Sequence, residues 1–151
     1  MKKGDTAPDF SLADQDGIVR SLDGLLAEGP VVLFFYPIAM TSGCTAEACH
    51  FRDLAAQYRA AGAQRVGISV DPVSTQKRFA DQYAFDYPLL SDERGAVAKQ
   101  FGVKRGVLGK LAPVRRKTFV IGQDRTILEV ISSEMKMDAH ADRALEVLAH
   151  R

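Results

Sequence analysis

An apolar run from Val31 to Tyr36 limits the possible folds more than any other stretch of the sequence. Uninterrupted apolar residues over such a length are typical of a strand that is buried on both faces of a sheet. Pro37 ends the run, because proline has no amide hydrogen to give to a sheet ladder. After a short linker, Thr41 to Gly43 favour the N-cap of a helix. The pattern therefore predicts a core strand that leads directly into a helix.

The predicted helix shows its buried face in the spacing of its residues. Small and apolar side chains recur at intervals of four, three, four and three: Cys44, Ala48, Phe51, Ala55 and Tyr58. The helix is expected to run to about Ala61, because Gly62 suits a C-cap. This places Cys44 in the first turn.

The first turn of a helix favours a thiolate. Its amides have no partners within the helix, and the N-terminal end of the helix dipole is positive. A free cysteine titrates near ~8.5, and such surroundings favour the ionised form at or below neutral pH. Cys44 is therefore a candidate nucleophile, and the alternative is a small buried side chain that only packs.

A second cysteine, Cys49, lies five residues after Cys44. In an intact helix, five residues separate the α-carbons by roughly 8 to 9 Å and turn the side chains ~140° apart. A disulfide needs α-carbons within about 7 Å. A bond between the two cysteines would therefore require the first turns to unwind, and a packing role for Cys49 stays open.

The composition bounds the organisation of the chain. With 151 residues, of which 46% are hydrophobic and 26% charged, one compact domain over residues 1–151 is expected. A formal charge of +1 gives no reason to expect nucleic acid or an acidic membrane as a partner. The N-terminus lacks the apolar core of a signal peptide, and no apolar run approaches ~18 residues, so a cytoplasmic protein is expected. No metal site is expected, because His140 and His150 lie far from the two cysteines in the sequence.

Strands and helices alternate along the chain. Strands are expected at residues 9–13, 18–21, 31–36, 64–70, 88–92, 117–122 and 126–132. Further helices are expected at 22–28, from Asp71-Pro72 toward residue 86, at 95–101 and at 138–149. Residues 102–113 are expected to form a loop, whose Val107, Leu108 and Leu111 are an apolar lip of a pocket or a subunit contact. This order predicts an α/β fold with a mixed central sheet, helices on both faces and an N-terminal β-hairpin.

The stretch around Cys44 resembles the active-site signature of a known family. The pattern Pro37-x-x-x-Thr41-x-x-Cys44 is similar to that of peroxiredoxins, which are thiol peroxidases with a thioredoxin-like fold. The continuation Gly43-Cys44-Thr45-x-Glu47-x-Cys49-x-Phe51-Arg52-Asp53 resembles the Q-type, or bacterioferritin-comigratory, subfamily. The resemblance extends from about Gly4 to the last predicted helix.

The resemblance implies roles for several residues. Cys44 is implied to be the peroxidatic cysteine and Cys49 the resolving cysteine. Thr41 is implied to hydrogen-bond the peroxide and Pro37 to shield the pocket from water, although a helix cap and a strand terminator are also ordinary roles for them. Thr41 to Gly43 together favour a shaped pocket for the substrate.

The family also has an arginine that reaches the thiolate from a late strand. The segment from Arg115 to Ile121 matches that strand, and its Arg-x-Thr-Phe pattern selects Arg116, with Arg115 as the alternative. A guanidinium near the sulfur stabilises the anion and orients the O–O bond. A solvated surface arginine is the other interpretation.

Two more residues of the predicted helix carry ionisable side chains. Glu47 is expected either to pair with an arginine such as Arg116 or Arg52, or to be an acid favoured by the helix dipole. His50 lies six residues after Cys44, so it is expected to face solvent rather than the sulfur, which argues against a cysteine–histidine protease.

The sequence departs from the subfamily at two places near the signature. Ser42 stands where proline is usual, which leaves the loop more flexible and favours unwinding. Residues 38–40 are Ile-Ala-Met where many members have Lys-Asp, so the pocket rim loses charge and more apolar hydroperoxides become candidate substrates.

The resemblance implies a two-cysteine peroxidase without metal, haem or flavin. Cys44 is oxidised to a sulfenic acid, Cys49 condenses with it, and a thioredoxin-like dithiol protein reduces the disulfide. A monomer or weak homodimer is expected. The rival hypotheses are a thiol–disulfide oxidoreductase, although the chain lacks Cys-x-x-Cys, and a redox-sensing or holdase-type binding protein.

Overall fold

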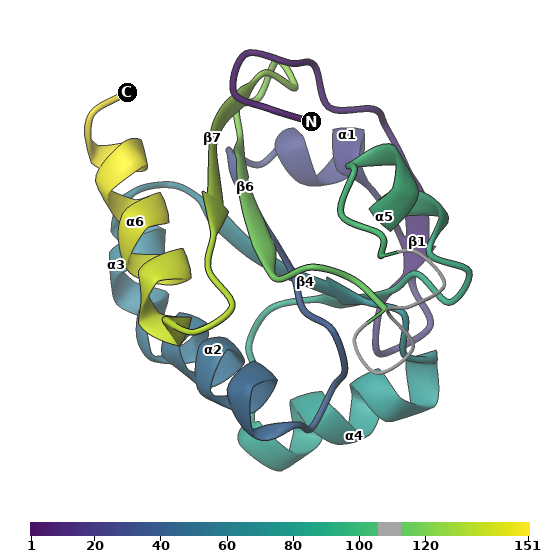
Figure 1. Cartoon of the computed structure of the whole chain (residues 1–151). Helices are drawn as coiled ribbons and strands as arrows, with labels where there is room; N and C mark the ends of the chain where they lie inside the picture. Colours follow the sequence, from purple (N-terminus) through teal and green to yellow (C-terminus); the bar gives the residue numbers. More distant parts are fainter. Residues whose placement is uncertain (106–112) are drawn as a thin grey trace.

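The computed structural model describes residues 1–105 and 113–151 (Figure 1). In this part of the chain, the main sheet has five strands in the order β5-β4-β3-β6-β7. β3 (Val31–Phe35) pairs in parallel with β4 (Gln64–Ser69) and antiparallel with β6 (Lys117–Ile121). β5 (Leu89–Ser91) is parallel to β4, and β7 (Ile127–Ser132) is antiparallel to β6. The predicted mixed sheet is confirmed, and the apolar run lies at its centre.

Both faces of β3 are buried, as its uninterrupted apolar run predicts. Val31, Leu33 and Phe35 pack in one core, and Val32 and Phe34 pack in another on the opposite face. The first core is covered by α1 (Leu22–Leu26) and α5 (Ala96–Gln100). The helices that cover the second core are α2 (Ser42–Asp53), α3 (Ala55–Ala60), α4 (Val73–Tyr83) and α6 (Met137–Ala149). This layering is that of a thioredoxin-like fold.

Hairpins lie near both ends of the chain. β1 (Ser11–Ala13) and β2 (Val19–Ser21) pair antiparallel, and β6 and β7 are joined by a turn in which Arg125 has a φ of +69°. The predicted loop falls only partly within the described residues, and Val107, Leu108 and Leu111 lie outside them. Within the described ranges, no helix is long and apolar enough to cross a membrane.

The helix after β3 ends earlier than predicted. α2 ends at Asp53, and Leu54, with φ −94° and ψ 19°, separates it from α3. α3 ends at the predicted place, where Gly62 has a φ of +70° and the amide of Ala63 donates to the carbonyl of Tyr58. The four-three spacing continues across the break through Ala55, which is partly buried, so the apolar pattern alone did not reveal it.

The predicted start of the next helix at Asp71-Pro72 is also wrong in detail. α4 begins at Val73, with Pro72 at its N-cap. The carboxylate of Asp71 accepts hydrogen bonds from the amide of Ala39 and the hydroxyl of Ser69, each at 2.7 Å. This long-range contact takes the carboxylate away from the helix and ties the end of β4 to the segment that precedes α2.

Candidate active site

The chain turns sharply between β3 and α2. Ala39 is held by Asp71, and the next residue, Met40, has a φ of +68°, which side chains other than glycine rarely adopt. α2 begins at Ser42, so Cys44 lies in its first turn. Cys44 is buried, with 1% of its surface exposed. The strained turn therefore directs the sulfur inward.

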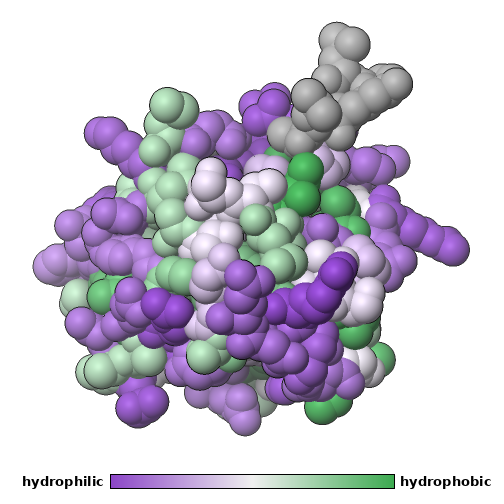
Figure 2. All heavy atoms as spheres, turned by 90° about the horizontal axis from the view of Figure 1, so that it is seen from below, coloured by the Kyte–Doolittle hydropathy of each residue, from purple (hydrophilic) through white to green (hydrophobic). Residues whose placement is uncertain are grey.

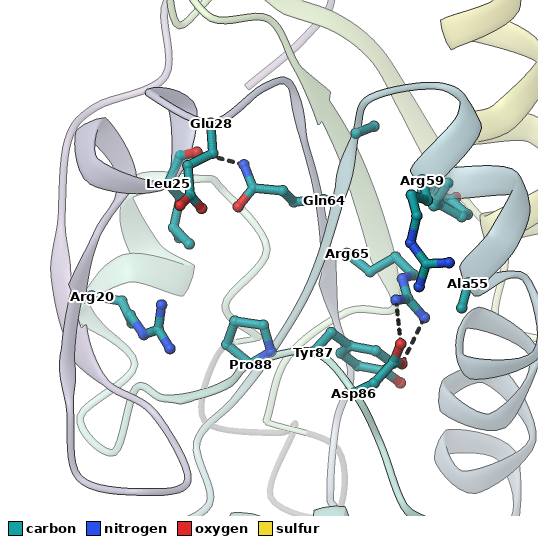
Figure 3. A pocket seen from close by; sticks show the side chains of 12 residues that line it. Arg20, Leu25, Glu28, Ala55, Arg59, Gln64, Arg65, Asp86, Tyr87 and Pro88 are labelled. Carbon is teal, nitrogen blue, oxygen red and sulfur yellow. Dashed lines mark hydrogen bonds and ion pairs between the residues drawn. The ribbon is translucent and has the colours of Figure 1, made fainter.

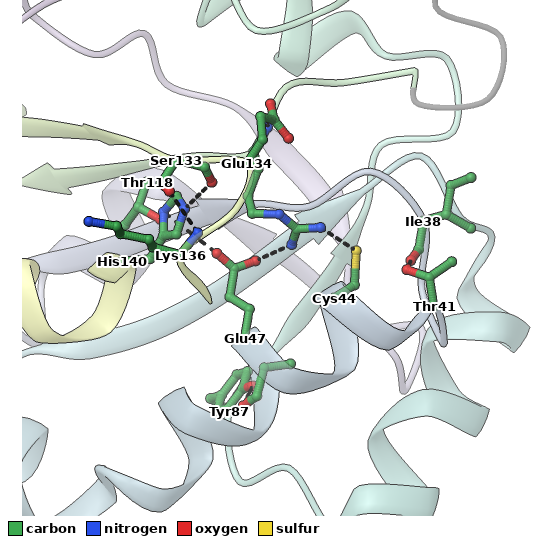
Figure 4. Close-up of polar contacts among 12 residues, drawn as sticks. Ile38, Thr41, Cys44, Glu47, Tyr87, Thr118, Ser133, Glu134, Lys136 and His140 are labelled. Carbon is green, nitrogen blue, oxygen red and sulfur yellow. Dashed lines mark hydrogen bonds and ion pairs between the residues drawn. The ribbon is translucent and has the colours of Figure 1, made fainter. Parts of the chain in front are cut away.

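The guanidinium of Arg116 lies beside this sulfur. Its Nη2 donates to Cys44 Sγ at 3.3 Å, and its Nη1 donates to Glu47 Oε1 at 2.8 Å (Figure 4). Arg116 immediately precedes β6, and the first residue of β6 pairs with the last residue of β3. Because α2 follows β3 after a short turn, this pairing places Arg116 near the start of α2. Arg115 is exposed, whereas Arg116 is buried. Of the two arginines that the sequence offered to Glu47, the structure pairs it with Arg116 and leaves Arg52 on Asp53.

Gly43 leaves the space that this guanidinium occupies. A Cβ atom at this position would lie 3.3 Å from Arg116 Nη2 and 3.6 Å from the sulfur of Met137. A carbon at 3.3 Å is closer than most such contacts, so the guanidinium would have to shift by a few tenths of an ångström. The absence of a side chain at Gly43 therefore leaves space for the guanidinium of Arg116.

A buried polar network lies behind Arg116. Glu47 Oε2 is 3.5 Å from Nδ1 of His140, a residue of α6. The same Nδ1 is 2.8 Å from the hydroxyl of Thr118, and His140 Nε2 is 2.8 Å from the carbonyl of Ser133 (Figure 4). Glu47, Thr118 and His140 are fully buried. The network thus connects α2, β6 and α6 beneath the sulfur.

Burial dominates the electrostatics of these groups. It raises the pKa of the Glu47 carboxyl to about 8, against the opposing effect of Arg116. It lowers the pKa of His140, which the Ser133 carbonyl opposes and Arg116 reinforces. Burial also works against the charge of Arg116, but Glu47 and Cys44 outweigh it and the pKa of the guanidinium is raised. Both shifts disfavour an ion pair between Glu47 and His140 despite their 3.5 Å separation.

Pro37 and Thr41 lie on either side of the strained turn. Pro37 is buried, and Thr41 is exposed at the N-cap of α2. The Thr41 hydroxyl donates to the carbonyl of Ile38 at 2.8 Å, and it makes no cap hydrogen bond within the described chain. Met40 is 41% exposed. The face seen from below in Figure 2 shows several separate apolar areas among hydrophilic side chains.

Cys49 is half-buried in the same helix as Cys44, and both thiols are free. Burial raises the pKa of the Cys49 thiol, against the effect of Arg52. The helix carries its own anchor next to this cysteine, because the hydroxyl of Tyr87 donates to the carbonyl of Ala48 at 2.6 Å. Cys49 is therefore held as a thiol in an intact helix.

A second anchor lies at the end of α2, beside a pocket of about 320 Å³ (Figure 3). Arg65 pairs with both oxygens of Asp86 at 2.9 Å and lies over the ring of Tyr87, 5.0 Å from its centroid. Its Nη1 also donates to the carbonyl of Phe51 at 3.0 Å. The second half of α2 is thus tied to β4 and to the segment that precedes β5.

His50 does not contact the sulfur. Its Nε2 lies 2.8 Å from Asp142 of α6, and its side chain is only 27% exposed. The expectation that it faces solvent is therefore only partly right, because α6 covers this side of α2.

Sequence reasoning missed His140 as a member of the site. The signal was present, because His140, Ala144 and Leu148 follow one another at four-residue spacing on the buried face of α6. A histidine among such small and apolar residues needs polar partners in the core. Thr118 and Ser133 supply them, from β6 and from the segment after β7.

The arrangement can stabilise a negative charge on sulfur and on an oxygen that approaches it. Arg116 is permanently charged, and its fork reaches Cys44 and Glu47 at once. In residues 1–105 and 113–151, no group of three or more histidine, cysteine or acidic side chains is placed to hold a metal ion. The chemistry that these residues offer is that of an activated thiolate.

Comparisons with known proteins agree with this chemistry. The AhpC/TSA family profile matches residues 3–130. A putative peroxiredoxin of Mycobacterium tuberculosis is 66% identical over 148 residues, which cover 98% of this chain and 96% of the relative. A chloroplastic peroxiredoxin Q of Populus jackii is 38% identical, over 98% of this chain and 68% of its own length.

Solved structures show the same relationship. The crystal structure of peroxidoxin BcpB from Mycobacterium tuberculosis matches with a TM-score of 0.95 and 65% identity, over 99% of this chain and 97% of that one. The bacterioferritin comigratory protein of Xanthomonas campestris, described for its alkyl peroxide reduction activity, matches with a TM-score of 0.83 and 28% identity. That match covers 93% of this chain and 90% of the other.

Proposed function

The chain belongs to the AhpC/TSA family of peroxiredoxins and is a thiol peroxidase, and on this premise we propose that Cys44 is its peroxidatic cysteine and Arg116 the cation that stabilises the thiolate. The observation that carries this assignment is the 3.3 Å contact between Arg116 Nη2 and Cys44 Sγ. Gly43 contributes the space for the guanidinium. The position of Cys44 in the first turn of α2 adds the helix dipole to the same effect.

The proposed first step is attack of the thiolate on the terminal oxygen of the hydroperoxide. The S–O bond forms as the O–O bond breaks, and the leaving oxygen takes a proton to become water or an alcohol. Arg116 stabilises the charge that develops on that oxygen. The Thr41 hydroxyl turns from the Ile38 carbonyl to the substrate, and Pro37 keeps water from the sulfur.

The proposed second step is condensation of Cys49 with the sulfenic acid of Cys44. The intact helix keeps the two apart, so its first turns must unwind. Two observations support unwinding at this end: the side chain of Thr41 makes no cap hydrogen bond within the described residues, and Met40 has a strained φ of +68°. The anchors on Ala48 and Phe51 confine the change to the residues before them.

The proposed reductant is a thioredoxin-like dithiol protein in the cytoplasm. Thiol–disulfide exchange through a mixed disulfide returns Cys44 and Cys49 to the reduced state. Association is proposed to be absent or weak. The large apolar side chains that are exposed in the described residues come from three separate segments of the chain: Ile18 with Val19, Met40, and Met135.

Organic hydroperoxides are proposed as substrates beside hydrogen peroxide. The Xanthomonas campestris relative is described for alkyl peroxide reduction. In this chain, the rim residues Ile38, Ala39 and Met40 carry no charge, and Met40 is 41% exposed. An apolar rim lowers the cost of bringing an alkyl group to the sulfur.

The function is tested by peroxide consumption coupled to thioredoxin and its reductase. We expect steady turnover with hydrogen peroxide and with cumene hydroperoxide, followed side by side by the oxidation of NADPH. Reduction of a protein disulfide without turnover of either peroxide would favour the thiol–disulfide oxidoreductase instead.

A further inference from the structure

The carboxyl group behind Arg116 takes no part in the steps above. We propose that the Glu47 carboxyl, whose Oε2 lies beside His140, holds one proton in the reduced enzyme. It releases this proton when the Cys44 thiolate is consumed. His140 is a positioning residue in this scheme, because it touches Glu47 and acts through it. The inference rests on the proposed function of Cys44.

The two oxygens of Glu47 have different surroundings. Oε1 accepts from Arg116, whereas the buried Oε2 has no hydrogen-bond partner among the described residues and lies 3.5 Å from His140 Nδ1. The Ser133 carbonyl can only accept, so Nε2 of His140 carries its hydrogen. Nδ1 of the neutral ring is then an acceptor, which the Thr118 hydroxyl occupies at 2.8 Å, so Nδ1 has no hydrogen to donate to Oε2. A charged carboxylate oxygen there would be buried without a donor, and protonation lowers this cost because it removes the charge.

One cation also serves two groups that can be anionic. Arg116 donates to Cys44 Sγ and to Glu47 Oε1, and two anions on one guanidinium would leave a net negative charge in a buried site. A thiolate at Cys44 therefore favours a neutral Glu47, and loss of the thiolate favours its ionisation.

The other ionisable groups near the pair do not supply a second cation to Glu47. Glu134, on the segment between β7 and α6, accepts from the backbone amide of Arg116 and pairs with Arg105 at 3.3 Å. Tyr87, which precedes β5, donates its hydroxyl to Ala48. Lys136 is exposed at the N-cap of α6.

The titration of the groups agrees with this geometry. Burial raises the pKa of Glu47 to about 8 and lowers the pKa of His140, so the shared proton lies on the carboxyl near neutral pH. Burial raises the pKa of Cys49 as well, so that thiol adds no second thiolate to the count.

The proton balance of the oxidation then closes within the protein. Cys44 thiolate, protonated Glu47 and a hydroperoxide give Cys44 sulfenic acid, ionised Glu47, and water or an alcohol. The sulfur loses two electrons to the O–O bond, and the proton that the leaving oxygen gains equals the one that Glu47 loses. Condensation with the Cys49 thiol releases water and no proton. Unwinding of the first turns brings Glu47 into water, where it stays ionised.

The test counts protons and thiolate together. Reduced protein in weak buffer near neutral pH is mixed with one equivalent of hydrogen peroxide, and a pH indicator and the ultraviolet thiolate absorbance are followed. We expect the wild-type chain to lose its thiolate with no net proton uptake. Glu47→Gln, which keeps the contacts of the protonated acid, is expected to take up one proton per thiolate lost. Glu146→Gln, an exposed change on α6, is the matched control and should behave like the wild type.

The pH dependence has a definite sign. Because the reduced-state pKa of Glu47 is about 8, the stored proton is absent above that value, and there the wild type should also take up one proton. Infrared difference spectra of the wild type near neutral pH should show a buried carboxyl C=O band that disappears on oxidation, whether or not Glu47→Gln folds.

Two results would overturn the inference: one proton taken up per thiolate in the wild type near neutral pH, or a reduced chain that reacts with peroxide but shows no thiolate absorbance there. The second result would mean that Glu47 is the anion on Arg116. Failure to react with peroxide at all would instead remove the proposed function.

Discussion

Replacing Arg116 by glutamine is expected to slow the oxidation of Cys44 by hydrogen peroxide about 100- to 1,000-fold, the usual effect of removing one donor from a developing negative charge. Arg116 donates to Cys44 Sγ at 3.3 Å and lies where it can also reach the leaving oxygen. Glutamine has a similar reach but no charge, so both the thiolate and the transition state lose stabilisation. Rapid mixing of the reduced protein with peroxide, followed by quenching and intact-mass spectrometry, measures the rate constant.

Arg115→Gln is the matched control for this change. It removes the same charge one residue earlier, from an exposed side chain, and should keep the wild-type rate constant. Loss of the hydrogen bond between Arg116 and the buried Glu47 carboxyl is expected to destabilise the Arg116 variant by about 1.5 to 3 kcal/mol, so thermal unfolding is recorded on the same samples. Arg116→Lys keeps the charge but cannot fork to Cys44 and Glu47 at once, and it should react at an intermediate rate. Equal slowing in the Arg115 variant would contradict the assignment.

Replacing Cys49 by serine is expected to abolish turnover with thioredoxin while the first oxidation of Cys44 proceeds. The serine hydroxyl cannot condense with the sulfenic acid to form a disulfide that thioredoxin can reduce. The wild-type chain, oxidised with one equivalent of peroxide, should lose two hydrogens in mass, and the variant should instead gain one oxygen. Intact-mass spectrometry distinguishes these products directly.

Ala46→Ser serves as the control for the serine itself. Ala46 is an exposed residue of the same helix, so this variant should keep thioredoxin-driven turnover. Continued turnover of Cys49→Ser with thioredoxin alone would show that Cys49 does not resolve the sulfenic acid. The chain would then be a single-cysteine enzyme that uses an external thiol.

Local patterns predicted most of what positions the sulfur. The apolar run of β3 is buried on both faces, and the four-three spacing of α2 placed Cys44 in its first turn. These features depend on neighbours in the sequence, where periodicity and helix capping have direct physical causes. Arg116 was selected differently, by its resemblance to a family pattern, since no local property distinguishes it from the exposed Arg115.

The features that sequence reasoning missed are set by contacts between distant segments. Asp71 has the composition of a helix cap, but the amide of Ala39 competes for its carboxylate. The break at Leu54 does not disturb the apolar spacing, so nothing in that pattern marks it. His140 reaches Glu47 only because α6 packs across α2, an arrangement that neither helix reveals by itself.

The claim that Cys44 is an activated thiolate is tested most directly by the second-order rate constant for its oxidation by hydrogen peroxide. This value is compared with the rate constant of free cysteine at the same pH. A thiolate held beside Arg116 should react at least ~100-fold faster than the free amino acid. A rate constant equal to that of free cysteine would contradict the assignment of Cys44 as the peroxidatic cysteine. It would favour a redox-sensing role for the cysteine pair.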